Sequence, residues 1–324
     1  MPVLPHSTYP GPPVFQFNGH LETMAPMLRR VDVPYERERL ELADGDFVDL
    51  DWVDRGSRKL VLLTHGLEGG SDRPYMKGMA RYFADRGWDA LAWNCRSCSG
   101  EMNRLLRLYH HGEIGDIGEV IAHALRTKDY THIAMIGFSM GGNITAKYLG
   151  VHGKEAPEAI RSAVVFSTPC DLEASILSIE KPLNRFYSQY FHKQLKVKIE
   201  AKAVQFPDQI DLRHFKTIKC WRDFDTHYST VLTGARDADA FYHQASSKNF
   251  MAGSKVPILI VNALNDPMLD GECYPTALCE KHPNLFLEMP RKGGHVGFLL
   301  PNAKHAWSEW RAWQFVGEWG EPNL

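Results

Sequence analysis

One serine of the chain lies between glycines at a spacing that is typical of a catalytic nucleophile. Residues 137–141, Gly-Phe-Ser-Met-Gly, fit the pattern Gly-x-Ser-x-Gly, in which the serine occupies a sharp turn between a strand and a helix. Side chains at Gly137 and Gly141 would collide with neighbouring backbone in so tight a turn. An apolar run precedes the motif and a helical pattern follows it. We therefore predict that Ser139 is a nucleophile, held in a strained conformation with its Oγ exposed.

A serine hydroxyl is a weak nucleophile near neutral pH, so it needs a base, and the base needs an acid that orients it. In folds that use this turn, the order along the chain is Ser, acid, His. His295 follows the last apolar run and is flanked by glycines, and it is the predicted base. The alternatives are His305, inside an expected helix, and His282, which precedes the last expected strand.

The predicted acid is Asp266, which follows the fifth apolar run of the chain. Ligands of open α/β sheets bind at the carboxyl ends of the strands, and this aspartate lies at such an end. An aspartate before proline is also a common turn residue. Asp171, after the fourth run, is the main rival for the role, and Asp270 is a weaker one.

The oxyanion that forms when a serine attacks an ester needs two fixed N–H donors. The backbone of Met140, directly after the nucleophile, is one candidate. We expect the other from the loop 65–70, His-Gly-Leu-Glu-Gly-Gly, where Leu67 is the natural donor. This chemistry needs no metal and no organic cofactor, and we expect neither.

Other residue pairs carry weaker signals. Cys95 and Cys98 form a lone Cys-x-x-Cys pair, and the second pair or the spaced histidines that zinc would need are absent from the sequence. The six cysteines are scattered, and the first residues lack the basic and apolar regions of an export signal. We therefore expect free thiols and a cytoplasmic protein. His110 and His111 are expected in a loop near the active-site face.

Charge and hydropathy exclude several classes of partner. The chain carries 37 Lys and Arg against 39 Asp and Glu, a formal net charge of −2, which gives no basic surface for nucleic acid. No apolar run approaches the ~18 residues that a membrane-spanning helix needs. The expected partner is a small-molecule ester or lipid substrate, and the expected state is a monomer or weak dimer.

The elements that must position these residues alternate along the chain. Short runs that are apolar on both faces predict parallel strands at 60–63, 89–93, 132–136, 162–166, 257–261 and 285–289. Helical patterns lie between them at 75–86, 116–128 and 142–149. Alternating apolar and polar residues predict a hairpin at 38–42 and 47–53 with one solvated face. The sequence thus predicts an α/β fold, a doubly wound and mostly parallel sheet, in one domain over 1–324 with an N-terminal arm at 1–30.

The interval 170–255 interrupts this alternation, because it contains no convincing core strand. We predict a mostly helical cap insertion over one end of the sheet; the alternative is a peripheral layer with no role in binding. The apolar residues spaced so that some can face a pocket are Ile176, Leu177, Ile179, Leu183, Phe186 and Tyr190; the alternative is that they only attach the cap to the sheet domain. The basic residues expected to face water are Lys193, Lys196 and Lys198.

Taken together, these motifs resemble the α/β-hydrolase superfamily, and most closely its YheT-like group of predicted esterases, whose animal relatives are ABHD-type lipid hydrolases. The matching segments are 19–23 (GHLET), 65–69 (HGLEG), 94–101 (NCRSCSGE), 103–104, 109–110, 137–143, 224–225 and 265–267. Ser97 departs from the group, which more often has glycine there. By the group's pattern the charge relay falls on Ser139, Asp266 and His295. The resemblance covers nearly the whole chain and implies the α/β-hydrolase fold with a helical cap.

The function expected from these residues is a serine hydrolase that cleaves carboxylic esters with short to medium or lipid-like acyl chains. An acyltransferase or thioesterase with the same triad is the alternative among enzymes, because it shares the acyl-enzyme and differs only in the acceptor. A non-catalytic binding protein on a hydrolase fold is the alternative outside enzymes.

Overall fold

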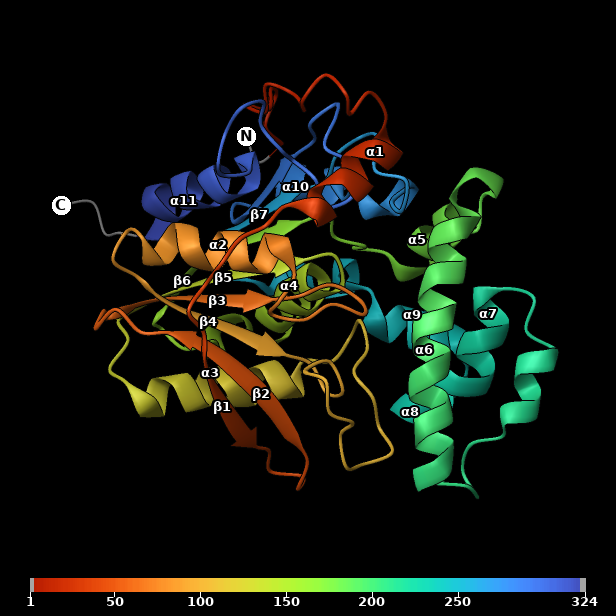
Figure 1. Cartoon of the computed structure of the whole chain (residues 1–324). Coiled ribbons are helices and arrows are strands. Elements are labelled where there is room, and N and C mark those ends of the chain that lie inside the picture. Colours follow the sequence, from red (N-terminus) through yellow and green to blue (C-terminus); the bar gives the residue numbers. More distant parts are fainter. Residues whose placement is uncertain (1–2, 321–324) are drawn as a thin grey trace.

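The computed structural model describes residues 3–320 and is built around one eight-stranded sheet (Figure 1). Its strand order is β1-β2-β4-β3-β5-β6-β7-β8. The pairs β1/β2 and β2/β4 are antiparallel, and all other pairs are parallel. The strands are β1 (Glu36–Glu41), β2 (Phe47–Val53), β3 (Lys59–Thr64), β4 (Asp89–Asn94), β5 (His132–Phe138), β6 (Ile160–Phe166), β7 (Ile258–Val261) and β8 (Leu285–Glu288). The predicted α/β fold with an N-terminal hairpin is confirmed.

Helices cover both faces of the sheet. On one face α2 (Pro74–Ala84) and α11 (Trp307–Gly320) share a core with the strands, and on the other α3 (Gly115–Thr127), α4 (Met140–His152) and α10 (Thr276–Lys281) do so. The central strand β3 is apolar and fully buried from Leu60 to Leu63, because it is covered on both faces. Burying one such side chain contributes about 1.5–3 kcal/mol. These helices fix the carboxyl ends of β3 and β5, where the site forms.

The hairpin differs from expectation on its polar face. Asp49 and Asp51 of β2 are each only 3% exposed. Arg39 donates two hydrogen bonds to Asp49, of 2.8 and 3.0 Å, and Arg37 donates two to Asp51, of 2.8 and 2.7 Å. The prediction of a solvated face is therefore wrong for β2, because arginines of β1 cover its carboxylates, and it is confirmed for β1, where Arg39 and Glu41 are exposed.

Between β6 and β7 the chain is helical and stands beside the sheet (Figure 1). Its helices are α5 (Leu172–Ile179), α6 (Arg185–Gln205), α7 (Trp221–Phe224), α8 (Thr230–Thr233) and α9 (Ala238–Ala245). A longer segment, 206–220, joins α6 to α7, and a π-helical stretch, Asp225–Ser229, joins α7 to α8. They share a hydrophobic core of their own, separate from the two cores of the sheet. We call this region the cap.

Three cap residues do not lie where the sequence predicts. Leu177 and Leu183 are 61% and 80% exposed, so neither faces a pocket. The side chain of Lys198 is only 13% exposed, because it forms an ion pair with Glu68 of the sheet domain. Lys193 and Lys196 are exposed, as expected.

The N-terminal arm runs from the β8 edge of the sheet to the cap. Val3 pairs with Leu287 of β8, and Ser7 donates a 2.6 Å hydrogen bond to Glu288. The arm then forms α1 (Gly19–Met24) and a 3₁₀ turn, Ala25–Leu28. Helix α1 reaches the start of α6 (Figure 1), where His20 Nδ1 lies 3.2 Å from Tyr187 Oη. Over residues 3–320, no helix has both the length and the apolar character needed to cross a membrane.

Candidate active site

Ser139 occupies the turn between β5 and α4. Its backbone angles, φ 53° and ψ −121°, are rare for any residue other than glycine. A Cβ atom on Gly137 would lie 2.4 Å from the carbonyl oxygen of Gly141, and one on Gly141 would lie 2.2 Å from that of Thr64. Both distances are far below van der Waals contact, so only glycine allows this turn. The strained turn is what presents the Ser139 side chain at the end of the strand.

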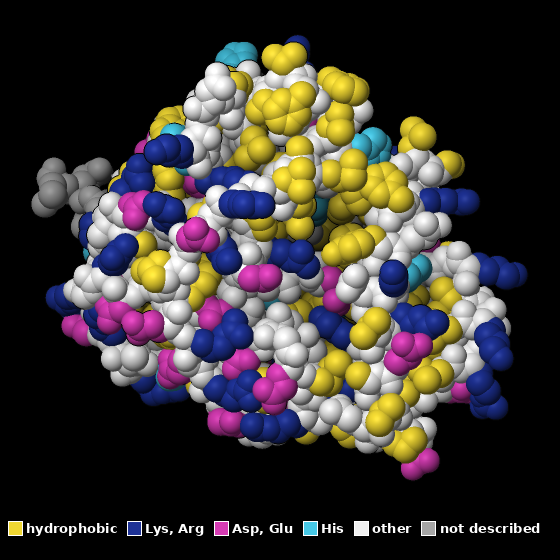
Figure 2. Space-filling view, in the orientation of Figure 1, with side chains coloured by type: hydrophobic (Ala, Val, Ile, Leu, Met, Phe, Trp, Pro, Cys, Tyr) yellow, Lys and Arg dark blue, Asp and Glu magenta, His cyan; other side chains and the backbone are white. Residues whose placement is uncertain are grey.

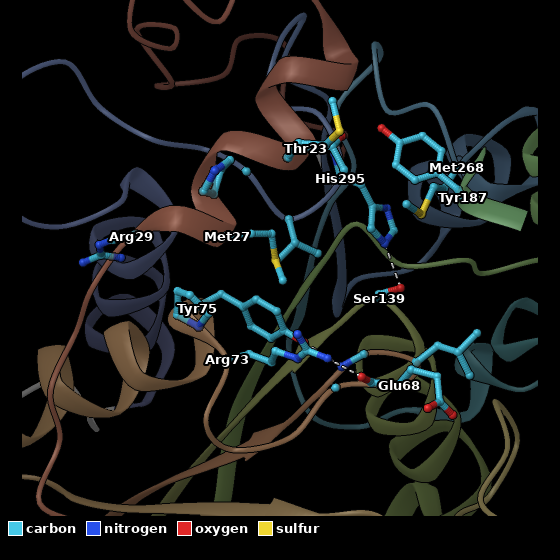
Figure 3. A pocket seen from close by; sticks show the side chains of 18 of the residues that line it. Thr23, Met27, Arg29, Glu68, Arg73, Tyr75, Ser139, Tyr187, Met268 and His295 are labelled. Carbon is cyan, nitrogen blue, oxygen red and sulfur yellow. Dashed lines mark hydrogen bonds between the residues drawn. The ribbon is translucent and has the colours of Figure 1, made fainter. Parts of the chain in front are cut away.

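Three predicted residues form one hydrogen-bonded chain. Nε2 of His295 lies 2.8 Å from Oγ of Ser139 (Figure 3), and Nδ1 of His295 lies 2.9 and 3.1 Å from the two carboxylate oxygens of Asp266. Asp266 is 5% exposed, and its Oδ1 also accepts a 2.8 Å bond from the backbone N–H of Met268. This arrangement can carry a proton from Ser139 to His295 while Asp266 holds the imidazole.

The alternative histidines lie elsewhere. His305 packs against the ring of Tyr82, with a centroid distance of 5.5 Å. Nε2 of His282 lies 3.0 Å from the carbonyl oxygen of Ala252. Neither residue belongs to the hydrogen-bonded chain at Ser139.

The alternative acids have structural roles. Asp171 caps α5 by accepting a 2.8 Å bond from Ala174, and it forms an ion pair with Lys248 at 2.5 Å. Asp270 accepts a 2.8 Å bond from Gly271 at the start of a 3₁₀ turn. Within the described chain, only Asp266 among these three aspartates contacts His295.

Of the two predicted oxyanion donors, Met140 follows Ser139 in the chain and Leu67 lines the same two cavities as Ser139. Met140 is the first residue of α4, so its backbone N–H has no acceptor inside the helix. Leu67 belongs to the loop after β3, and Gly66 of that loop packs so closely that an added Cβ would lie 3.1 Å from Cβ of Ser139. Tyr75 Oη accepts a 3.1 Å bond from the N–H of Gly66 and fixes this approach.

A buried polar cluster supports the loop that carries Leu67. Glu68 adopts a positive φ of 54°, and its N–H donates a 3.1 Å bond to Tyr109 Oη. The same hydroxyl donates to the Glu68 carboxylate, which also pairs with Lys198 of α6 at 3.0 Å. Arg73 donates a 2.6 Å bond to the carbonyl oxygen of Glu68 (Figure 3). The cap therefore contributes a cation to the support of this loop.

His65, directly before that loop, is fully buried and does not act on Ser139. Its Nδ1 donates to the carbonyl oxygen of Gly66 at 2.8 Å, and its Nε2 accepts a 3.0 Å bond from the N–H of Cys95. Burial lowers the pKa of His65 to about 4, so the ring is neutral at physiological pH. The residue joins the ends of β3 and β4.

The N-terminal arm holds the His295 loop, a contact that the sequence does not predict. Glu22 of α1 is 1% exposed, and its Oε2 accepts hydrogen bonds from the N–H of Gly293 and from Asn265 Nδ2, the latter of 3.0 Å. Thr23 Oγ1 accepts a 2.9 Å bond from the N–H of His295. The only sequence signal for this role is that both residues fall in the segment 19–23 of the family resemblance.

Two cavities meet at Ser139 and His295. The larger, of about 400 Å³, lies among the arm, α2 and the start of α6 (Figure 3). The smaller, of about 90 Å³, lies under the cap. The larger is lined by residues that include Met24, Met27, Tyr75, Phe186, Tyr187, Tyr190 and Met268. The smaller is lined by residues that include Leu108, Ile176, Ile179, Leu195, Ile199, Trp221, Phe224 and Phe241.

His110 and His111 lie in the wall of the smaller cavity. Burial lowers the pKa of His110 to about 4 and that of His111 to about 3, so both rings are neutral near pH 7. Burial also raises the pKa values of the Cys95 and Cys98 thiols, which makes them poor metal ligands and weak nucleophiles. The described residues contain no group of three or more His, Cys, Asp or Glu side chains able to hold a metal ion.

Comparison with known proteins places this chain in a family. Residues 59–301 match the family model described as alpha/beta hydrolase fold. "Putative esterase YheT" of Escherichia coli is 34% identical over 87% of this chain and 84% of its own length. "Phospholipase ABHD3" of Homo sapiens is 28% identical over 92% of this chain and 75% of its own length.

The fold is also similar to that of solved structures. The Pyrococcus furiosus esterase Pf2001 superposes with a TM-score of 0.59 at 18% identity, over 90% of this chain and 99% of its own. The resemblance that the sequence motifs indicate is confirmed. The chain belongs to the alpha/beta hydrolase family, in the group that includes YheT and the ABHD3 phospholipases.

Proposed function

We propose that the protein is a serine hydrolase that cleaves carboxylic esters, with Ser139 as nucleophile. The observation that carries the proposal is the hydrogen-bonded chain Ser139–His295–Asp266 at the junction of two apolar cavities. Within the family, this chain is similar in sequence to proteins named as a putative esterase and as phospholipases, and ester hydrolysis is the chemistry common to those names.

In the proposed mechanism, Ser139 Oγ attacks the ester carbonyl carbon while its proton passes to His295 Nε2. Asp266 holds the imidazolium that results. The N–H groups of Leu67 and Met140 donate to the oxyanion. Collapse of the tetrahedral intermediate breaks the bond to the alcohol oxygen, which leaves with the proton from His295. Water, activated by the same imidazole, then hydrolyses the acyl-enzyme and releases the acid.

The two cavities favour a substrate that is apolar on both sides of the ester group. The smaller cavity accommodates a short chain, and the larger falls in the size range of small-molecule sites. We infer that one cavity takes the acyl chain and the other takes the alcohol part. A lipid-like ester fits this division better than a polar polymer does.

Labelling with a fluorophosphonate, followed by hydrolysis of p-nitrophenyl esters of increasing chain length, tests the proposal. Ser139→Ala should abolish both labelling and turnover, because no other group replaces the nucleophile. Ser57→Ala, in the turn before β3, is the matched control and should leave both unchanged. Wild-type turnover in the Ser139→Ala protein would show that the reaction uses another nucleophile.

The same assay separates the alternatives. An acyltransferase would be labelled by the fluorophosphonate but would release p-nitrophenol slowly in water; an added alcohol or thiol acceptor would speed that release and take the acyl group as a new ester or thioester. A non-catalytic binding protein would bind esters and show neither labelling nor turnover. Rapid release of free acid in water alone supports hydrolysis.

A further inference from the structure

Large apolar side chains stand exposed around the mouth of the larger cavity. They come from the N-terminal arm and from residues 183–190, which form the end of a 3₁₀ turn and the start of α6. The two segments touch at His20 and Phe186, with a ring distance of 5.6 Å. We call these residues the collar: Val14, Phe15, Phe17, Met24, Met27, Leu28, Leu183, Phe186 and Tyr190. Figure 2 shows apolar side chains gathered on this side of the molecule, around a hollow.

The exposure of the collar is unusual for a folded chain. Phe15 and Phe17 are 65% and 72% exposed, and Leu28 and Leu183 are 83% and 80% exposed. Contiguous apolar surface of this kind marks an interaction site, whereas single exposed apolar residues need no explanation. The collar side chains contribute little to the core of this protein, so their apolar character serves contact with something outside it.

The collar is continuous with the larger cavity. Four of its residues, Met24, Met27, Phe186 and Tyr190, are exposed to solvent and also line that cavity. An apolar molecule can therefore follow apolar side chains from the outside of the protein into the cavity that contains Ser139. This continuity favours a partner that contains the substrate over a partner that covers the mouth.

The exposed charged residues of the two segments that carry the collar are basic. In residues 14–30 and 181–190 the single acidic residue is Glu22, which is buried. Arg29 and Lys181 pair with Glu309 and Asp270. Arg30 and Arg185 are exposed and have no ion-pair partner among residues 3–320. A chain with a net charge of −2 thus presents unpaired arginines next to its exposed apolar residues.

We propose that the collar docks the protein onto an anionic lipid surface, with the mouth of the larger cavity facing the lipid. Apolar side chains enter the boundary between headgroups and acyl chains, and the two arginines pair with lipid phosphates. An ester substrate can then pass from the lipid into the cavity without crossing water. The docking is inferred from the exposed residues of the collar alone, whereas the passage of substrate rests on the proposed function.

Flotation with vesicles tests the docking without any need for activity. Vesicles of phosphatidylcholine with 30 mol% phosphatidylglycerol should carry the wild-type protein, and phosphatidylcholine alone should carry less. The double variant Phe15→Ser and Phe17→Ser should lose at least tenfold in partitioning. The double variant Arg30→Gln and Arg185→Gln should lose the preference for the anionic vesicles.

The matched control is the double variant Val204→Ser and Val231→Ser, which removes two exposed apolar residues of the cap outside the collar. It should bind vesicles as the wild type does. Neither phenylalanine of the first variant lines a cavity, so it should keep the melting temperature and the hydrolysis of a soluble short-chain ester.

Several outcomes would overturn the docking: no flotation of the wild type, equal flotation of the collar and control variants, or a dimer in light scattering that only the collar variant disrupts. The last result would identify a second copy of the chain as the occupant. Collar-dependent flotation without ester hydrolysis would support the docking and reject the proposed function instead.

Discussion

Removing the carboxylate of Glu22 tests whether the N-terminal arm holds the proposed base in place. One oxygen of this buried group accepts hydrogen bonds from Gly293, two residues before His295, and from Asn265, the neighbour of Asp266. Glu22→Ala removes both bonds and leaves two buried donors without an acceptor. The loops that carry the base and the acid then lose their common anchor.

The size of the effect follows from the number of bonds. A hydrogen bond to a charged group contributes about 1.5–3 kcal/mol, so two such bonds contribute about 3–6 kcal/mol. Each 1.36 kcal/mol changes a rate tenfold. If this energy serves to position His295 in the transition state, Glu22→Ala lowers kcat by about 10²- to 10⁴-fold and changes KM much less.

Glu22→Gln is the matched conservative variant. Its amide oxygen can occupy the place of Oε2 and accept both bonds, while its NH₂ group takes the place of Oε1, which has no hydrogen-bond partner in the structure. We expect a loss in kcat of less than about tenfold, because the geometry remains and only the charge is lost. Glu158→Ala, at an exposed glutamate, should have no effect.

The assay is hydrolysis of a soluble p-nitrophenyl ester at saturating concentration, with the melting temperature measured in parallel. Folded Glu22→Ala protein with kcat within threefold of wild type would refute the reasoning. Equal losses in the alanine and glutamine variants would also refute it, because the hydrogen-bonded geometry would then not be the cause.

Three further predictions follow from single contacts. Asp266→Asn should lower kcat by about 10³- to 10⁴-fold, because the imidazole tautomer is no longer fixed, whereas Asp171→Asn should change kcat only a few-fold. A larger loss of kcat in Asp171→Asn than in Asp266→Asn would show that Asp171 is the acid of the triad. Ile176→Trp should fill the smaller cavity and shift the preferred substrate to esters with shorter chains, whereas Leu177→Trp, at an exposed position, should leave the preferred chain length unaltered. The same shift in both variants would show that the smaller cavity does not set the chain length. Burial raises the pKa of Asp225 from 3.8 to about 6, so the folded state binds its proton more tightly, and the contribution of this group to stability should fall by about 3 kcal/mol as pH rises from about 4 to about 6. Chemical denaturation should therefore show wild type losing stability relative to Asp225→Asn over this pH range, and a gain of stability in wild type relative to the variant would contradict the prediction.

The positions of the parallel strands in the sequence and the turn at Ser139 could be predicted, because both depend on residues that are close in sequence. A strand covered on both faces must be apolar at every position, as residues 60–63 are. The turn needs glycine at two fixed positions, because a Cβ there would meet backbone. The structure places Asp266 and His295 at Ser139, although their catalytic roles stay predictions, as do the cytoplasmic location and the oligomeric state.

The errors concern residues whose environment depends on distant segments. Asp49 and Asp51 alternate with apolar residues as a solvated face would, yet arginines of β1, Asn94 of β4 and the loop residue Ser99 hydrogen-bond to them. Lys198 lies in a basic stretch of a helix, where exposure is the ordinary expectation, but the cap places it against Glu68 of the sheet domain. Leu177 shares a helix with Ile176, and only the packing of that helix decides which of the two is buried.

The amino-acid sequence by itself determined the α/β fold, the strained turn at Ser139 and the candidates for base and acid, because periodicity and steric demand act within a few residues. Only the tertiary structure decided which aspartate meets His295, that Glu22 anchors the loop 271 positions later, and that two cavities meet at the serine. The physical reason is that a hydrogen bond or a cavity wall depends on distance in space. Side chains far apart in sequence acquire that proximity only when the whole chain has packed.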